Sequence, residues 1–421
     1  MALDPEELKK RRMERKKQAE LRKKKNRALL VRLCFAGLVL AAVIGGIVLL
    51  VNRGGSQEPA PQTLSTETQA PVPETTQGAT TVVHVAAAGD LTVSDAVVAA
   101  GGGTYDYTET FRDVAYLLSD ADLAVVNFEG LLQGDPYGST HSAPQALADA
   151  LHAAGVDLIQ LANSYSIAKG MLGLSSTIDA VRAAGMEPLG VYSSQSDYDA
   201  RGGYTVCQVK GIKIAFVAFT KGMDGMTLPA GSENCVNVLY EDYDSTYQKI
   251  NRTKINAVLD AAEAEDPDII IAMLHWGSEY NDTISSSQES IRKLLQNRGV
   301  DAIIGTHSHY VQQMSLDPLT GQFVAYSLGD FLGDAQRAGS EYSVVLNLEI
   351  TRDNASGDTR ITNYTYTPIF TVAEPEKPLR VVRIRQAMAA FEASYISPVR
   401  QETYDAMKYA LGRIEARIAG E

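Results

Sequence analysis

Cysteine is scarce in this chain, with three residues in 421. Cys34 lies inside an apolar run, and no lipoprotein-type cleavage motif surrounds it. Cys207 and Cys235 could pair in an oxidising compartment or stay free. One pair excludes a small fold held together by several disulfides. The chain must rely on a hydrophobic core, which its 45% of hydrophobic residues can supply.

A second absence lies near the N-terminus. No A-x-A-like cleavage site follows the run LCFAGLVLAAVIGGIVLLV, residues 33–51. This run carries no charge, and as a helix it measures roughly 28 Å, close to the thickness of a bilayer core. A cleaved signal peptide is the competing interpretation. The length of the run and the missing site favour one uncleaved N-terminal transmembrane helix.

Charge is divided unevenly along the chain. Residues 1–32 hold 13 Lys+Arg and 5 Asp+Glu, which leaves 25 basic and 46 acidic residues, a balance of -21, for the remainder. The basic flank should stay in the cytoplasm, so we expect a single-pass type II protein of the cell membrane with an extracellular body. Contact with lipid head groups explains the basic tail, so we expect no nucleic acid partner.

Composition and periodicity divide the rest of the chain into three parts. Residues 52–80 are rich in Pro, Thr, Gln and Ser and predict a disordered extracellular linker. From residue 81 to 375, buried strands such as IKIAFVAFT and PDIIIAMLHWG alternate with helical stretches such as SAPQALADALHAAG, which predicts an α/β domain. The segments YSVVLNLEIT and TRITNYTYTPI lack intervening helices and predict an antiparallel edge. Residues 376–421 predict a C-terminal helical extension that docks on the body; a partner-binding helix is the alternative.

Polar residues collect just past the carboxyl ends of the predicted strands, the edge where open α/β sheets bind ligands. Carboxylates, an amide and imidazoles suit a divalent ion such as Zn, Mn or Fe, whose identity the sequence leaves open. Two such ions can clamp a phosphate-like group and activate a water. We therefore predict that one metal site contains Asp90, Glu129, Asn163, His275, His307 and His309.

Each of these residues also has a structural interpretation. A Gly-Asp after a strand is usually a turn, and His275 beside Trp276 could be a hydrogen-bonded core histidine. Their common position at strand ends is hard to explain by packing. Two of the other histidines, His84 and His152, lie inside apolar patterns and are expected to be structural. His141 lies in a predicted loop, and the sequence shows no partner for it.

The order of the motifs AAGDLTVSD, VVNFEG, LHWGSEY, IIGTHSHYVQ and YSLGDF resembles the CapA (PgsA) family of capsule and poly-γ-glutamate biosynthesis proteins. The resemblance implies a four-layer α/β/β/α metallophosphatase-like sandwich, with Asp90, Glu129, His275, His307 and His309 at site positions. It also implies an anionic polymer such as poly-γ-glutamate and membrane-bound polymer synthetase subunits as partners.

Departures from the family pattern concern catalysis. Where the family usually has N-N-H-x-x-D-x-G, this chain has NSYSIAKG (163–170), so Tyr165 replaces the His and Ala168 the Asp. In YSLGDF, Asp330 replaces the usual Asn. Tyrosine can donate a proton, but its ordinary pKa near 10 makes it slow at neutral pH. The candidate catalytic residues are His309, Tyr165 and Glu279.

Three functions follow. The first is a membrane-anchored component of extracellular polymer assembly, as a metal-dependent hydrolase or transferase. The second is a phosphoesterase acting on another external substrate, which the fold alone permits. The third is a non-catalytic binding module that keeps the cleft. The altered segment 163–170 favours the third over the second, whereas the retained histidines favour an enzyme.

Overall fold

The computed structural model describes residues 79–375, 377–393 and 399–420. The predicted basic tail (1–32), the predicted span (33–51) and all but the end of the predicted linker (52–80) lie outside these residues. Within the described ranges, no helix is both long and apolar enough to cross a membrane.

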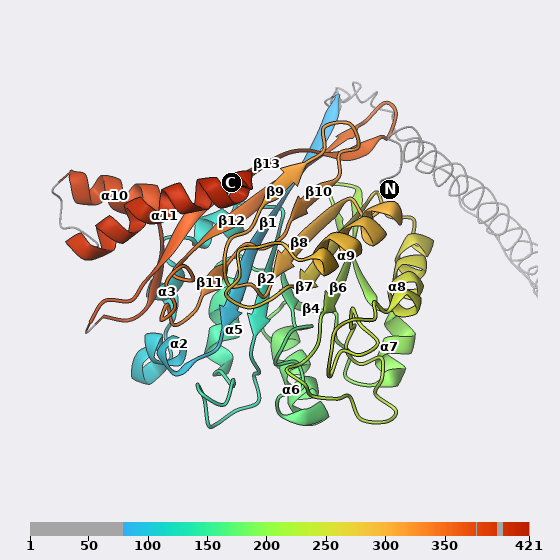
Figure 1. The fold of residues 1–421 in the computed structure, drawn as a ribbon, viewed down its shortest axis with the longest axis horizontal. Coiled ribbons are helices and arrows are strands. Elements are labelled where there is room, and N and C mark those ends of the chain that lie inside the picture. Colours follow the sequence, from blue (N-terminus) through green and yellow to red (C-terminus); the bar gives the residue numbers. More distant parts are fainter. Residues whose placement is uncertain (1–78, 376, 394–398, 421) are drawn as a thin grey trace, which may run out of the picture. The chain divides into compact units, whose positions relative to one another are not determined.

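Two mixed sheets form the body (Figure 1). The first sheet has the order β14 (Arg380–Arg383), β13 (Thr359–Val372), β12 (Tyr342–Asp353), β1 (Thr80–Thr92), β2 (Leu123–Glu129), β3 (Leu158–Gln160) and β4 (Glu187–Leu189), with β11 (Asp330–Leu332) paired to β1. The second has the order β5 (Tyr204–Val209), β6 (Ile212–Thr220), β7 (Ile269–His275), β8 (Ala302–Thr306), β10 (Phe323–Ala325) and β9 (Met314–Leu316). The predicted α/β class is confirmed.

In the second sheet, parallel strands lie at the centre and antiparallel strands at both edges, whereas in the first sheet the parallel strands run to the β4 edge and the antiparallel strands lie on the other side. β1 to β4 pair in parallel, and so do β6, β7, β8 and β10. β12, β13 and β14 continue the first sheet in antiparallel fashion, as predicted for the first two of them. The boundary drawn at residue 375 falls between β13 and β14, so the sheet runs on into the predicted extension.

Strand periodicity explains how the sheets stack. On β1, Ala86 and Ala88 face one apolar cluster and Val85 and Ala87 face another, because successive side chains point to opposite faces. The second cluster also receives alternate residues of β6, β7 and β8, so it fills the space between the two sheets. The outer faces are covered by helices.

The helices have these bounds: α2 (Asp95–Ala100), a 3₁₀ turn (Gly102–Thr104), α3 (Thr108–Phe111), α4 (Ala115–Ser119), α5 (Gln145–Ala153), α6 (Gly170–Ala183), α7 (Gln195–Arg201), α8 (Arg252–Ala264), α9 (Ser286–Asn297), α10 (Ile384–Glu392) and α11 (Gln401–Ala419). Helices α2 to α6 pack on the outer face of the first sheet, and α8 and α9 on that of the second. Ser285 begins α9 with a capping box to Gln288.

The two C-terminal helices pack on each other and on β12 and β13 (Figure 1). The predicted apolar stripe of α11 is buried at Met407, Ile414 and Ile418 within the inter-sheet cluster. The extension is therefore a docked part of the body. Cys207, on β5, and Cys235 are both free, so the pair is not bonded.

Candidate metal centre

The carboxyl ends of the parallel strands from both sheets meet at one place. Asp90 on β1 is in register with Asn127 on β2, and His275 at the end of β7 is in register with Thr306 at the end of β8. The histidines His307 and His309 follow β8 directly, both with left-handed backbone (φ 87° and 58°). Such angles are uncommon outside glycine and cost of order 1–2 kcal/mol each, which often marks a functional loop.

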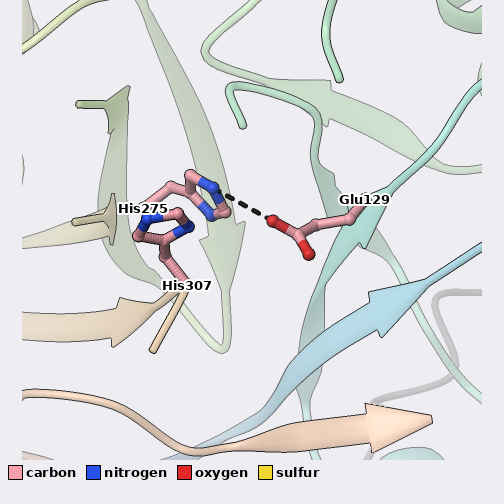
Figure 2. Close-up of side chains that lie close together, drawn as sticks. All are labelled: Glu129, His275 and His307. Atoms are coloured by element: carbon pink, nitrogen blue, oxygen red, sulfur yellow. Dashed lines mark ion pairs between the residues drawn. The ribbon is translucent and has the colours of Figure 1, made fainter. Parts of the chain in front are cut away.

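One group of ligand-type side chains consists of Glu129, His275 and His307. Their ligand atoms lie within 4.8 Å of one another, and all three residues are buried. Figure 2 shows the carboxylate of Glu129 on one side and the two imidazoles on the other. Nε2 of His275 lies 3.0 Å from Glu129 Oε1, and the two imidazole centroids are 4.3 Å apart.

The second group consists of Asp90, His309 and Asp330, also buried and within the same mutual distance. Nδ1 of His309 lies 2.7 Å from Asp330 Oδ1 and 4.0 Å from Asp90 Oδ2. Its Nε2 lies 3.9 Å from Glu129 Oε2, so His309 connects the two groups. The carboxylates and imidazoles therefore form one continuous cluster.

His307 carries the clearest indication that this cluster holds a cation. Both of its ring nitrogens are buried and neither has a hydrogen-bond partner. At least one nitrogen of a neutral imidazole is a strong acceptor, and leaving it desolvated and unpaired is costly. Coordination of a divalent ion beside Glu129 and His275 satisfies it. The residues present thus fit a metal ion.

Electrostatics in the cluster agree with this assignment. Burial lowers the pKa of His275 despite the opposing effect of Glu129, and burial together with the charges of His275 and Lys221 lowers that of His307. A lowered pKa favours the neutral imidazole that binds metal. Burial raises the pKa of Glu129, but the imidazoles of His275 and His309 outweigh it and bring that pKa to about 2. Burial and the charge of Glu129 raise the pKa of Asp90 well above its usual range. A cation here relieves the repulsion between these carboxylates.

Asn163 lies at the same edge but is bonded within the protein. Its Nδ2 donates to the Phe128 carbonyl at 2.7 Å and to Asn127 Oδ1 at 3.3 Å. Its Oδ1 accepts from the Tyr165 amide at 3.1 Å. Asn163 therefore shapes the turn that carries Ser164, whose Oγ lies 3.0 Å from His275 Nε2.

Comparison with known proteins agrees with this picture. Residues 84–335, more than half of the chain, match the family described as "Bacterial capsule synthesis protein PGA_cap". This chain belongs to that family.

Two relatives of this chain are both named CapA. The capsule biosynthesis protein CapA of Bacillus anthracis is 26% identical over 260 residues, covering 60% of this chain and 60% of the relative. The PGA biosynthesis protein CapA of Bacillus subtilis is 24% identical over 205 residues, covering 49% and 50%. The chain thus spans about half to three-fifths of the length of these relatives. The predicted resemblance to the CapA family is confirmed.

Solved structures with a similar arrangement include the calcineurin-like phosphoesterase YfkN of Bacillus subtilis, at 14% identity and a TM-score of 0.45, covering 80% of this chain and 98% of that one. A phosphatase of Mycoplasma pneumoniae is 16% identical, with a TM-score of 0.42, and covers 69% and 94%.

The resemblance predicts a histidine at position 165, where this chain has Tyr165, and the structure gives this side chain a partner. The ring of His141 stacks on that of Tyr165, with centroids 3.8 Å apart. The sequence showed no partner for His141, because this contact joins a loop to a turn and leaves no sequence pattern. Burial raises the pKa of Tyr165 well above 10. Glu279 is exposed on the loop after β7 and contributes no atom to either ligand group.

Several residues around the PGA_cap site had no assigned role from sequence. Asp330 completes the second ligand group, and Asn127 donates a 2.6 Å hydrogen bond to Asp90 Oδ1. Asn127 lies two residues before the end of β2 and Asp330 begins β11, and the available signal was their place next to the apolar runs VVNFEG and YSLGDF. Thr92 Oγ1 donates to Glu129 Oε2 at 3.0 Å, and Tyr280 stacks on His309 with centroids 4.8 Å apart. Nothing in the sequence spacing indicates these last two contacts.

Proposed function

We propose that this protein is a membrane-anchored extracellular component of capsule biosynthesis that acts on poly-γ-glutamate or a related anionic surface polymer as a metal-dependent hydrolase or transferase. The observation that carries the proposal is the unpaired imidazole of His307 beside Glu129 and His275 within the PGA_cap region. The name of the Bacillus subtilis relative, a PGA biosynthesis protein, supports the choice of polymer.

The cation would be Zn, Mn or Fe, because imidazoles and carboxylates in one cluster suit these ions. Such an ion supplies Lewis-acid polarisation of a substrate oxygen and lowers the pKa of a bound water. Glu129, His275 and His307 would hold one ion, and Asp90, His309 and Asp330 a second. Thr92 and Ser164 would keep Glu129 and His275 oriented through their hydrogen bonds.

The proposed location rests on the apolar run at 33–51 and the basic residues before it. A type II arrangement leaves residues 1–32 in the cytoplasm and the body outside, next to membrane-bound synthetase subunits. Protease added to intact protoplasts should digest the body and leave the basic tail protected. Digestion of the body only after lysis would place it inside the cell and refute this arrangement.

A second candidate is a non-catalytic polymer-binding scaffold. The observation in its favour is Tyr165, whose raised pKa makes the phenol a poor proton donor at neutral pH. A metallophosphoesterase with another external substrate is the remaining enzyme alternative. It requires the same proton donor, so Tyr165 weighs against it more directly.

The test replaces His275 and His307 by alanine in the native cells. We expect metal content of the purified protein and the amount of anionic surface polymer to fall together, since both depend on the same cluster. His152→Ala is the matched control, because this histidine lies on α5 and bonds only the Val156 carbonyl. Loss of metal with unchanged polymer would exclude the metal-dependent enzyme and leave the scaffold.

A further inference from the structure

Lys221 is placed beside the metal-centre residues by strand register. It follows Thr220, the last residue of β6, which pairs with His275 at the end of β7. Its backbone amide donates to the His275 carbonyl at 2.7 Å. Lys221 therefore leaves the sheet at the same edge as the histidines, and its position is fixed by the main chain.

The side chain of Lys221 has few partners of its own. Nζ donates to the Gly277 carbonyl at 2.9 Å and lies 4.8 Å from the ring centroid of Tyr247. No carboxylate of the described part of the chain lies within ion-pair distance of it. An ammonium has three donors, and one carbonyl uses only one of them.

Lys221 is half-buried at this edge of the sheet. The one carboxylate that acts on its charge is that of Glu279, which is exposed and makes no ion pair with it in the described part of the chain. A half-buried cation without an ion-paired partner is costly, so its position next to a ligand site indicates that an anion completes it.

We propose that Lys221 binds an oxyanion of the substrate, a carboxylate or a phosphate, beside the metal centre. The proposal rests on the proposed function and names the part of the site that selects anionic substrates. It also resolves a difficulty of charge, because residues 33–421 carry a balance of -21 and repel a polyanion at long range. Repulsion from distant charges is screened beyond about 8 Å at physiological salt, so a local cation can dominate binding.

The alternative role of Lys221 is structural, namely fixing the loop after β7 through the Gly277 carbonyl. Lys213, near the start of β6, offers a matched comparison. Its Nζ also donates to a single carbonyl, that of Glu265, at 2.6 Å, but at the opposite end of β6. Replacing either lysine by methionine keeps the aliphatic stem and removes the charge.

The experiment uses the full chain in detergent, loaded with Mn²⁺. Calorimetry measures the Kd of a γ-linked glutamate decamer, of the same decamer with amidated carboxyl groups, and of inorganic phosphate. We expect Lys221→Met to weaken decamer binding about tenfold or more, the effect of losing one charge-assisted hydrogen bond. Lys221→Arg should restore it to within about threefold, and Lys213→Met should leave it unchanged.

The outcomes separate this proposal from the proposed function. The oxyanion role would be overturned if Lys221→Met bound the decamer, and also inorganic phosphate, with the same Kd as wild type. It would also be overturned if Lys221→Met weakened binding of the amidated decamer as much as binding of the decamer itself. Absence of decamer and phosphate binding in the wild type would do the same. If Lys221→Met weakened binding of inorganic phosphate but not of the decamer, the result would support the oxyanion site with a phosphate substrate. Failure of the wild type to bind Mn²⁺ would instead count against the proposed function.

Discussion

The backbone amide of His307 donates a 2.9 Å hydrogen bond to Asp90 Oδ2. This bond joins the end of β8 in one sheet to the end of β1 in the other, across 217 residues of sequence. It also fixes the position of the His307 main chain, because the donor is the backbone amide of that residue. Asp90 therefore has two tasks, as a candidate ligand and as the acceptor that holds the histidine loop.

Asp90→Asn is expected to separate these two tasks. An amide oxygen can still accept from the His307 backbone, but the charge that attracts a cation is lost. Because burial and Glu129 raise the pKa of Asp90 in the folded state, its ionised form destabilises the metal-free protein above pH 4. In the variant the Asn127 amide, which donates to Asp90 Oδ1, meets an NH₂ group instead, and this loss of stability does not depend on pH. We therefore expect the metal-free variant to lose less stability than wild type as pH rises from 4 to 7, and to bind Mn²⁺ more weakly. Parallel stability curves for the two metal-free proteins over that range would contradict this.

His307→Ala is expected to remove the stabilisation that metal gives. Saturation of the wild type at about 100 times the Kd should stabilise the fold by roughly 2.7 kcal/mol. The variant lacks the unpaired imidazole, so most of that gain should disappear. Thermal unfolding with and without Mn²⁺ measures it. His152→Ala should retain the full gain; if it loses as much, the effect does not come from the cluster.

Tyr165→His is expected to raise any residual phosphoesterase activity. A histidine there restores a proton donor with a pKa near neutrality, and general acid catalysis typically contributes 10²–10⁴-fold. We expect a rise of about a hundredfold, the low end of such effects, with a chromogenic phosphodiester and Mn²⁺. Tyr165→Phe, which keeps the stack on His141, should give no rise. An unchanged rate in the histidine variant would show that the proton donor is not what limits activity.

Arg417→Ala is expected to loosen the C-terminal helix. Its guanidinium lies over Tyr310, at 4.7 Å from the ring centroid, and 3.2 Å from Asp282. The Arg417 side chain is 9% exposed and Asp282 is 41% exposed, so the ring contact is largely desolvated and the ion pair is partly hydrated. We expect a loss of about 1–2 kcal/mol in the free energy of unfolding by urea. Lys408→Ala, at an exposed position of the same helix, should change it by less than about 0.5 kcal/mol.

The features that depend on strand direction could be predicted from the sequence. His275 and His307 were expected near each other because parallel strands end at the same edge, and their rings lie 4.3 Å apart. The stretch YTVCQVKGIKIAFVAF likewise predicts a hairpin that turns at Lys210–Gly211, and both residues have left-handed backbone there. Alternation of side chains along a strand, or residues typical of a turn, are enough for such predictions.

Contacts between loops could not be predicted in the same way. The stack of His141 on Tyr165, the bond from Lys221 to Gly277 and the packing of Arg417 on Tyr310 each join segments without a shared period. Their geometry depends on loop conformations, including the left-handed angle at His141. The order of strands in the sheets likewise follows from packing between distant segments, which no local pattern encodes.

Glu374 should make stability depend on acid. This carboxylate follows β13, is 6% exposed, and bonds Lys377 Nζ at 2.9 Å, the Arg400 amide at 2.7 Å and Thr403 Oγ1 at 3.1 Å. Burial raises its pKa, but these partners outweigh burial and lower it to about 2 from 4.5. A carboxyl with a lowered pKa contributes stability that is complete above its unfolded pKa and is lost as pH falls through the folded value. The contribution, about 3 kcal/mol at neutral pH, should therefore disappear between pH 4.5 and 2. Glu374→Gln removes the titration, so urea unfolding should show a variant less stable than wild type at pH 7 and nearly equal to it at pH 2. Parallel curves for the two proteins over that pH range would show that Glu374 does not anchor α11.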